Sequence, residues 1–172
     1  MAMPEPIPAP EARPDVERLR GYSAPLEGRR GLLRLDFNEN TLGPSPAVAE
    51  AIRSFPADQI AVYPEYDGLR EAVIRNLQAS PAGLVHELLP QQVGLFNGVD
   101  AAIHAVIHAY GGPGETLLTT SPTFGYYAPC AGMQGMEVEA VPHALPGFGF
   151  PLEQIREALE RRPRILMLCN PN

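Results

Sequence analysis

The first half of the chain has short periodic segments that are separated by proline and glycine. Apolar and polar residues alternate over residues 33–37, which predicts a short strand. Ser45 followed by proline is typical of a helix N-terminus, and the apolar spacing predicts a helix over residues 46–55. Asp67 is a candidate cap for a second helix that ends near residue 79. We expect both helices to face the core, the second through Leu69, Val73 and Leu77.

The second half alternates segments of strand and helix character. Strands that are separated by helices pair in parallel through crossover connections. The pattern therefore predicts the α/β class, with an open, mostly parallel sheet covered by helices. The predicted strands are residues 93–96, 116–120, 137–141 and 164–169, and the predicted helices are residues 99–110, 122–133 and 152–161. The apolar face of the first of these helices comprises Ile103, Val106, Ile107 and Tyr110.

Composition narrows the class of partner. The 172 residues are 45% hydrophobic, which is enough apolar material for a core, and no apolar run is long enough to span a bilayer. A net charge of -7 and a pI near 5.1 argue against nucleic acid and anionic membranes as partners. Two cysteines and no secretory leader favour the cytoplasm. His104 and His108 are spaced for a shared metal ion, but no third ligand is evident, so we predict a polar helix face and no metal site.

The corner at residues 97–100 is the first candidate for chemistry. A strand is expected to end there and a helix to begin, and a helix start carries amide groups that have no partner within the helix. Gly98 allows a tight turn, and the amides of Val99 and Asp100 then suit a phosphate group. The alternative is an ordinary strand-to-helix turn in which Asp100 only caps the helix. Neither a Walker loop nor a dinucleotide fingerprint is present at this corner.

Five segments, taken together, resemble the pyridoxal-phosphate-dependent aminotransferases of fold type I, class I/II, and among them the histidinol-phosphate aminotransferase-like branch. The resemblance runs from about Leu19 to the last residue. It implies that the chain is part of the large domain of such an enzyme. The segments are DFNENTLGPSP (36–46), VYPEYDGLREAV (62–73), FNGVDAAI (96–103), GPGETLLTTSPTFGYY (112–127) and LMLCNPN (166–172).

The resemblance implies roles for particular residues. Gly98, Val99 and Asp100 match the cradle for the cofactor phosphate, and Phe124 matches the aromatic residue that stacks on the pyridine ring. Tyr63 matches a tyrosine that reaches the phosphate in the neighbouring subunit's site, which implies a homodimer. Plain core burial remains the alternative for Phe124, and a surface turn the alternative for Tyr63.

Two further segments match the substrate side of the site. Asn38, Glu39 and Asn40 match a segment that lies over the active site and helps to close it, although all three also suit turns. Residues 170–172 match the start of a motif whose next asparagine bonds the phenolic oxygen of the cofactor. Thr41 and Leu42 stand where the family usually has proline and often an aromatic residue, which leaves aromatic and other amino acids open as substrates.

The absence of lysine limits the mechanism. The chain contains 13 arginines and no lysine. Transamination in this family needs a lysine amine, which bonds the cofactor aldehyde and moves a proton. We therefore expect the chain to be the N-terminal part of a longer enzyme, inactive alone, with the lysine, the pyridine-nitrogen aspartate and the carboxylate-binding arginine further along.

This interpretation gives a domain organisation and a function. We expect a disordered proline-rich arm over residues 1–14, an N-terminal segment with lead-in helices over 15–90, and the first half of the cofactor-binding domain over 91–172. The expected reaction transfers an amino group between an amino acid, or an amino-alcohol phosphate such as histidinol phosphate, and a 2-oxo acid. The alternatives are a lyase or decarboxylase of the same fold and a regulatory domain that binds the cofactor without catalysis.

Overall fold

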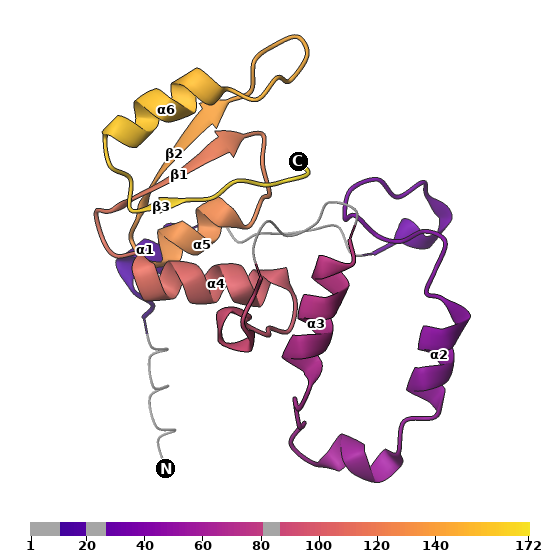
Figure 1. The fold of residues 1–172 in the computed structure, drawn as a ribbon. Helices are drawn as coiled ribbons and strands as arrows, with labels where there is room; N and C mark the ends of the chain where they lie inside the picture. The colour runs from indigo at the N-terminus through magenta and orange to yellow at the C-terminus, as the bar shows by residue number, and fades with distance from the viewer. Residues whose placement is uncertain (1–10, 20–26, 81–86) are drawn as a thin grey trace, which may run out of the picture. The chain divides into compact units, whose positions relative to one another are not determined.

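A computed structural model describes residues 11–19, 27–80 and 87–172 (Figure 1). The chain divides into two compact units. The sheet unit comprises Phe96–Asn172 together with the chain up to Ser23, and the helical unit comprises Ala24–Leu95. Most of the predicted proline-rich arm, residues 1–14, lies outside the described residues.

The sheet unit is built on parallel strands. Within the described residues the sheet has the order β2-β1-β3, with β1 (Thr116–Ser121) at its centre. Its neighbours are β2 (Glu137–Pro142) and β3 (Ile165–Leu166), and both pair with β1 in parallel. The predicted parallel α/β sheet is therefore confirmed, although β3 is shorter than the predicted strand 164–169.

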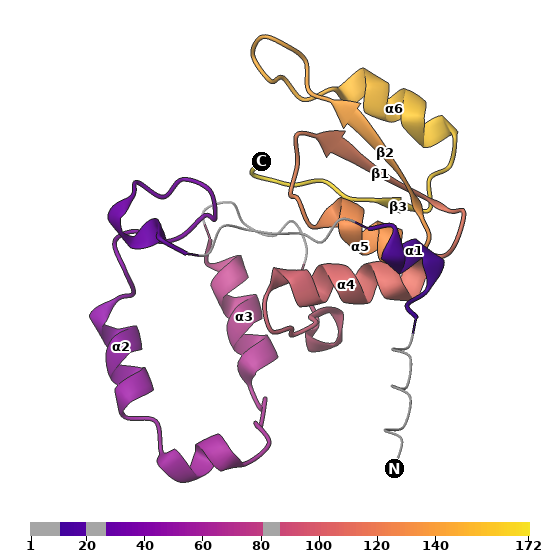
Figure 2. The ribbon, with the colours of Figure 1, turned by 180° about the vertical axis from the view of Figure 1, so that it is seen from behind.

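Helices cover both faces of this sheet. α4 (Val99–Tyr110) and α5 (Tyr127–Met133) lie on one face, and α6 (Leu152–Glu160) lies on the other (Figures 1 and 2). Successive residues of β1 point to opposite faces, so Leu117 joins the α4 and α5 core while Leu118 joins the core under α6. The short α1 (Pro14–Glu17) packs against α5, where the Arg13 guanidinium donates to the Met133 carbonyl at 2.5 Å.

Local signals located the helices well, with corrections at their ends and faces. α4 has the predicted bounds, but on its predicted apolar face only Ile103 and Ile107 are buried, while Val106 and Tyr110 are 40% and 61% exposed. α5 begins at Tyr127, so the first five residues of the predicted helix 122–133 form a loop instead.

The helical unit contains α2 (Pro46–Arg53), α3 (Leu69–Gln78) and short 3-10 turns at Arg29–Gly31, Ala57–Ala61 and Pro90–Gln92. The predicted cap of α2 is confirmed, because the Ser45 hydroxyl accepts from the Val48 amide at 3.4 Å. The predicted cap of α3 is wrong. Gly68 precedes that helix with φ 74°, a left-handed conformation that glycine adopts without strain, and Asp67 then lies one residue too early to cap.

The predicted core-facing stripe of α3 is only partly buried. Leu69 and Leu77 are 43% and 41% exposed, and Ile74 is the buried residue of this helix. The apolar residues of α2 are also exposed, with Val48 at 50% and Ile52 at 71%. Within the described residues the prediction that α2 faces the core is therefore wrong, and for α3 it is met only in part, through Ile74.

Two predicted strands do not form. Residues 33–37 are irregular, and Leu33 and Leu35 are 83% and 82% exposed. Asp36 within this segment forms an ion pair with Arg29 of the preceding turn. Residues 93–96 are also irregular, and the Val93 amide donates to the Pro90 carbonyl at 3.2 Å. A strand needs a neighbouring ladder, and the described residues supply none beside either segment.

Candidate functional site

The start of α4 is open. Gly98 precedes the helix with φ 87° and ψ 161°, a conformation that is essentially restricted to glycine. Its own N–H donates to the Phe96 carbonyl at 3.0 Å, and no side chain of the described residues caps the helix. The amides of Val99 and Asp100 therefore form a donor pair at the positive end of the helix dipole. Apart from Gly98 and its two chain neighbours, no atom of the described residues lies within 4 Å of where Gly98 would carry a Cβ, so a ligand has room to approach.

Asp100 does not cap α4, contrary to the alternative reading of this corner. It is the second residue of the helix, and its charge acts instead on α5. Burial raises the pKa of the Cys130 thiol, a hydrogen bond with Tyr126 lowers it, and the Asp100 carboxylate raises it. Cys130 is only 1% exposed, and its sulfur lies 3.7 Å from Nδ1 of His104. The first turns of α4 and the body of α5 are thus in electrostatic contact.

Phe124 lies in the loop that leads from β1 into α5. Its ring is half-buried and meets the ring of Tyr127 edge-on, with the centroids 5.6 Å apart. It packs against the same apolar cluster that contains Ile103, one turn inside α4. The sheet unit therefore brings the Phe124 loop and the first turns of α4 onto one core, at the end of the sheet where the strands finish.

Two buried hydroxyls lack partners in the described residues. They are Oγ1 of Thr119, on β1, and Oγ1 of Thr123, directly before Phe124. Nearly all buried polar groups in proteins are hydrogen-bonded, so an unpaired hydroxyl beside a candidate site suits a ligand group. Sequence reasoning missed Thr123, although a hydroxyl residue just beyond the carboxyl end of a parallel strand was a usable signal.

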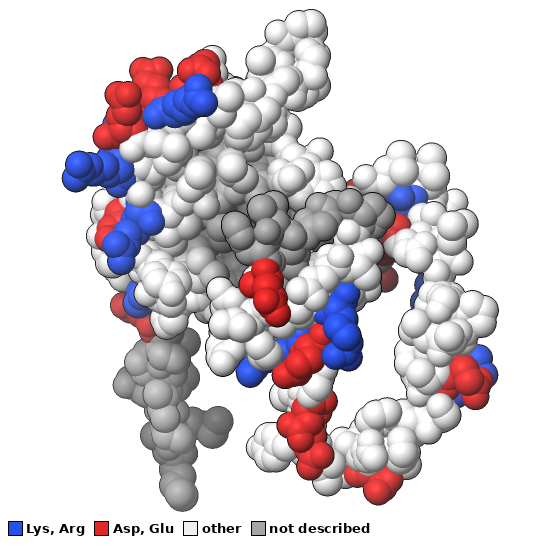
Figure 3. Space-filling model, viewed as in Figure 1, with Lys and Arg blue, Asp and Glu red and all other residues white. Residues whose placement is uncertain are grey.

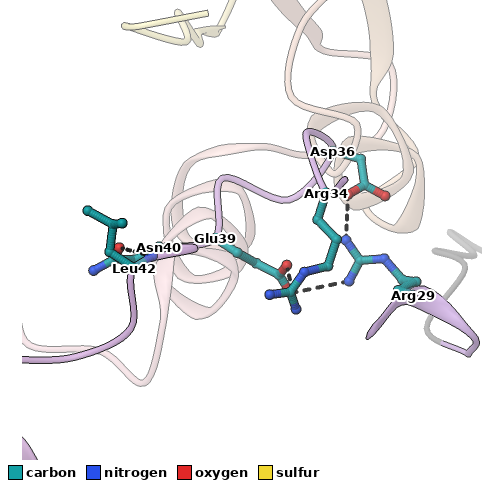
Figure 4. A network of polar contacts seen from close by, with 6 residues as sticks. All are labelled: Arg29, Arg34, Asp36, Glu39, Asn40 and Leu42. Atoms are coloured by element: carbon teal, nitrogen blue, oxygen red, sulfur yellow. Dashed lines mark hydrogen bonds and ion pairs between the residues drawn. The ribbon is translucent and has the colours of Figure 1, made fainter. Parts of the chain in front are cut away.

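Glu39 takes part in a network of ion pairs in the helical unit (Figure 4). The Arg29 guanidinium donates to Asp36 and, at 3.2 Å, to Glu39, and Arg34 pairs with Glu39 at 3.1 Å. The same Arg29 group lies 4.1 Å from the centre of the Phe37 ring. Both oxygens of Glu39 therefore face arginines, and this carboxylate holds the segment together.

Asn38 and Asn40 shape the turns of this segment. Asn38 has φ 52°, in the left-handed region that asparagine tolerates better than most residues. The side chain of Asn40 accepts from the Leu42 amide at 3.1 Å and donates to the Gly43 carbonyl at 2.8 Å. The turn-forming role that the sequence left open for these asparagines is thus present in the structure.

The Arg29 network makes a testable prediction. Its hydrogen bond holds the pKa of the Asp36 carboxyl below the usual value. Because the pKa of Asp36 is lower in the folded state than in the unfolded state, its ionised carboxylate stabilises the folded segment at any pH above the ordinary carboxyl pKa. This stabilisation is lost as the pH falls through the lower pKa of the folded state. We expect Arg29→Ala to raise the pKa of Asp36 toward normal, measured by NMR titration of its carboxyl carbon.

The matched control for that experiment is Arg30→Ala. Arg30 is the next residue and has no ion pair within the described part of the chain. It should leave the titration of Asp36 unchanged. An Asp36 pKa that stays low after Arg29→Ala would show that another group sets it.

Tyr63 belongs to the helical unit, and its side chain is 97% exposed. No described residue of its own unit covers the ring. Neighbouring apolar residues share this exposure, with Ile60 at 74% and Val62 at 62%. An exposed aromatic residue among apolar neighbours suits a contact with another surface.

The chain belongs to the aminotransferase class I and II family, whose pattern it matches over residues 30–172. It is 34% identical over 159 residues to a histidinol-phosphate aminotransferase of Ruegeria pomeroyi. The matched region covers 91% of this chain and 41% of that relative. The histidinol-phosphate aminotransferase of Symbiobacterium thermophilum is also 34% identical, with 93% and 44% covered. The chain thus spans less than half the length of these relatives.

Solved structures show the same fold. A histidinol-phosphate aminotransferase of Sinorhizobium meliloti, solved in complex with pyridoxal-5'-phosphate, superposes with a TM-score of 0.67 at 21% identity. The match covers 90% of this chain and 41% of that one. This match confirms the predicted fold class, in which the chain forms part of the large domain of this transferase family.

Two negative findings concern only the described residues. They contain no group of three histidine, cysteine, aspartate or glutamate residues that could hold a metal ion, and His104 stacks on His108 with centroids 5.8 Å apart. None of their helices has the length and apolar character that a membrane crossing requires.

On the face in Figure 3, acidic and basic side chains are interspersed over α6, where Arg156 pairs with Glu153 at 2.9 Å.

Proposed function

We propose that the full-length protein uses pyridoxal phosphate to transfer an amino group between an amino donor and a 2-oxo acid. The donor is an amino acid or an amino-alcohol phosphate such as histidinol phosphate. The open start of α4 at Gly98, in a chain that belongs to this family, carries the proposal. The relatives named as histidinol-phosphate aminotransferases support the donor class.

The phosphate of the cofactor is assigned to the start of α4. A phosphate dianion needs several donors and a positive potential, and the unpaired amides and dipole of a helix start supply both. Gly98 lets the backbone present the amides of Val99 and Asp100 without a side chain in the way. Val99 has no hydroxyl to add, so in this account the backbone donors do most of the binding.

The ring of the cofactor is assigned to Phe124. A half-buried phenylalanine that is fixed edge-on by Tyr127 can present a flat apolar face to a heteroaromatic ring. The unpaired hydroxyl of Thr123 lies next to it as a donor for a polar group. Asn38, Glu39 and Asn40 are proposed to lie on the substrate side, with Glu39 acting through its ion pairs rather than by direct contact.

The reacting amine has to come from outside these residues. Bound pyridoxal phosphate supplies an electron-withdrawing ring that stabilises negative charge at the substrate α carbon. This chain contributes binding and orientation, because it has no lysine to bond the aldehyde or carry the proton. Gly98, Val99, Asp100 and Phe124 therefore form one wall of the proposed site.

We further propose that the full-length protein is a cytoplasmic homodimer. Tyr63 in the neighbouring subunit's site is the proposed link between subunits. Its 97% exposure, together with the exposed Ile52 and Ile60, supports a surface that a second subunit covers.

The proposal is tested with the full-length protein loaded with pyridoxal phosphate. Incubation with an amino acid or histidinol phosphate and with 2-oxoglutarate should yield glutamate and the oxo product of the donor in equal amounts. Carbon dioxide or an elimination product without glutamate would indicate a lyase or decarboxylase instead. Cofactor binding without any turnover would favour a regulatory domain.

Phe124 offers a more specific prediction. Phe124→Leu keeps an apolar side chain but loses the stacking face, which is worth about 0.5–1.5 kcal/mol beyond buried area. We expect pyridoxal phosphate to bind roughly two- to tenfold more weakly, measured as a dissociation constant by absorbance titration. Phe124→Tyr retains the ring and should bind nearly as the wild type. Equal affinity of the Leu variant would remove Phe124 from the site.

A further inference from the structure

A second polar arrangement lies at the end of the sheet where the strands finish. His143 follows β2, and its backbone amide donates to the Ser121 carbonyl at 2.9 Å, which extends the ladder of the sheet by one bond. Its Nε2 lies 3.2 Å from Nδ2 of Asn172. The same Nδ2 donates to the Pro122 carbonyl at 2.8 Å. Pro122 begins the loop that carries Phe124.

The protonation of this arrangement follows from its partners. The Pro122 carbonyl can only accept, so the amide nitrogen of Asn172 and not its oxygen must face it. That nitrogen has only hydrogens to offer, so Nε2 of His143 must accept the second of them. These partners fit the tautomer of the imidazole that carries its proton on Nδ1.

The other side of the imidazole agrees with this assignment. Nδ1 of His143 lies 3.2 Å from the Phe148 carbonyl, which can only accept a hydrogen bond. Phe148 belongs to a small loop that closes on itself through two hydrogen bonds between Ala144 and Gly149. The ring of Phe150 meets the imidazole edge-on, with centroids 6.2 Å apart. The Phe148 carbonyl and the Phe150 ring therefore orient the imidazole of His143 toward Asn172.

We propose that His143 and Asn172 are positioning residues, which hold the Phe124 loop in place for the cofactor ring through a continuous hydrogen-bonded brace. The brace runs from the Phe148 carbonyl through the imidazole and the Asn172 amide to the Pro122 carbonyl. It fixes the backbone at Pro122, two residues before Phe124. The inference rests on the proposed cofactor site and adds residues that do not themselves touch the cofactor.

The first test concerns the brace itself and needs no cofactor. In the full-length protein with ¹⁵N-labelled histidine, the imidazole of His143 should show protonated Nδ1 and unprotonated Nε2. Asn172→Asp replaces the donor amide with a group that cannot donate to either partner, and it should change the chemical shift of Nε2. A proton on Nε2 in the wild type would overturn the proposal.

The second test measures the cofactor. Asn172→Asp and His143→Phe should each raise the dissociation constant of pyridoxal phosphate by about threefold to tenfold, the loss expected of a neutral hydrogen bond. They should also alter the circular dichroism of the bound cofactor, which reports how its ring is held. Because both residues act in one brace, the double variant should bind hardly more weakly than either single variant.

Matched variants separate positioning from general damage. His143→Gln offers an amide oxygen that can accept from Asn172, and it should recover part of the lost affinity. His108→Gln changes an exposed histidine outside the brace and should bind as the wild type. Normal affinity and dichroism in Asn172→Asp would overturn the brace alone, whereas a wild-type protein that does not bind pyridoxal phosphate would overturn the proposed function and the brace together.

Discussion

Gly98→Ala is expected to weaken the binding of pyridoxal phosphate to the full-length protein by roughly tenfold to a hundredfold. At φ 87° and ψ 161° a side chain is strained, and such strain costs about 1–3 kcal/mol. The backbone can relieve that strain only by rotating, which turns the amides of Val99 and Asp100 away from the phosphate. The dissociation constant, measured by absorbance titration, gives the effect directly.

Gly147→Ala is the matched control for this change. Gly147 is also in open space, but its φ lies outside the positive range that strains a side chain. It should bind the cofactor as the wild type does. If Gly98→Ala binds equally well, the phosphate does not depend on the geometry of this helix start.

Ile107→Ala is expected to lower the free energy of unfolding by about 2–5 kcal/mol, because it leaves a cavity in a filled core. Ile107 is 0% exposed and lies in the cluster that joins α4 and α5 to Leu117 of the sheet. The measurement is denaturant unfolding of the full-length protein, followed by far-ultraviolet circular dichroism. Val106→Ala removes a 40% exposed neighbour and should cost about 1 kcal/mol or less. Equal losses in the two variants would contradict the packing described for α4.

Helices could be predicted because their signals are local. The Ser45 cap and the bounds of α4 follow from residues a few positions apart, and the structure confirms both. The cap at Asp67 failed for an equally local reason, since the next residue is a glycine that turns left-handed. Periodicity identified the amphipathic faces, but whether a face is covered depends on what lies beside it, as the exposed Leu69 shows.

Strands were predicted less well because a strand requires a partner. β1 and β2 formed as expected and pair with each other in register from Thr116 and Glu137. Residues 33–37 and 93–96 have the composition of strands, but no described segment pairs with either. Alternation along the chain shows which face would be buried, and it carries no information about whether a neighbouring ladder exists.

The residues of the candidate site also differ in how far they could be predicted from the sequence. Gly98 was recognised from its immediate neighbours, and the open helix start agrees with that reasoning. Asn172 was named only as part of a motif, because its bonds reach back 50 residues to Pro122 and 29 residues to His143. The ion pairs of Glu39 with Arg29 and Arg34 could not be predicted either, since no periodic pattern links side chains in an irregular segment.

The most direct measurement is a crystal structure of the full-length protein with pyridoxal phosphate bound. We expect phosphate oxygens about 2.7–3.2 Å from the amide nitrogens of Val99 and Asp100, with the pyridine ring lying flat against Phe124. A phosphate bound elsewhere would contradict it. So would a protein side chain that occupies the start of α4, or a Phe124 ring that points away from the cofactor.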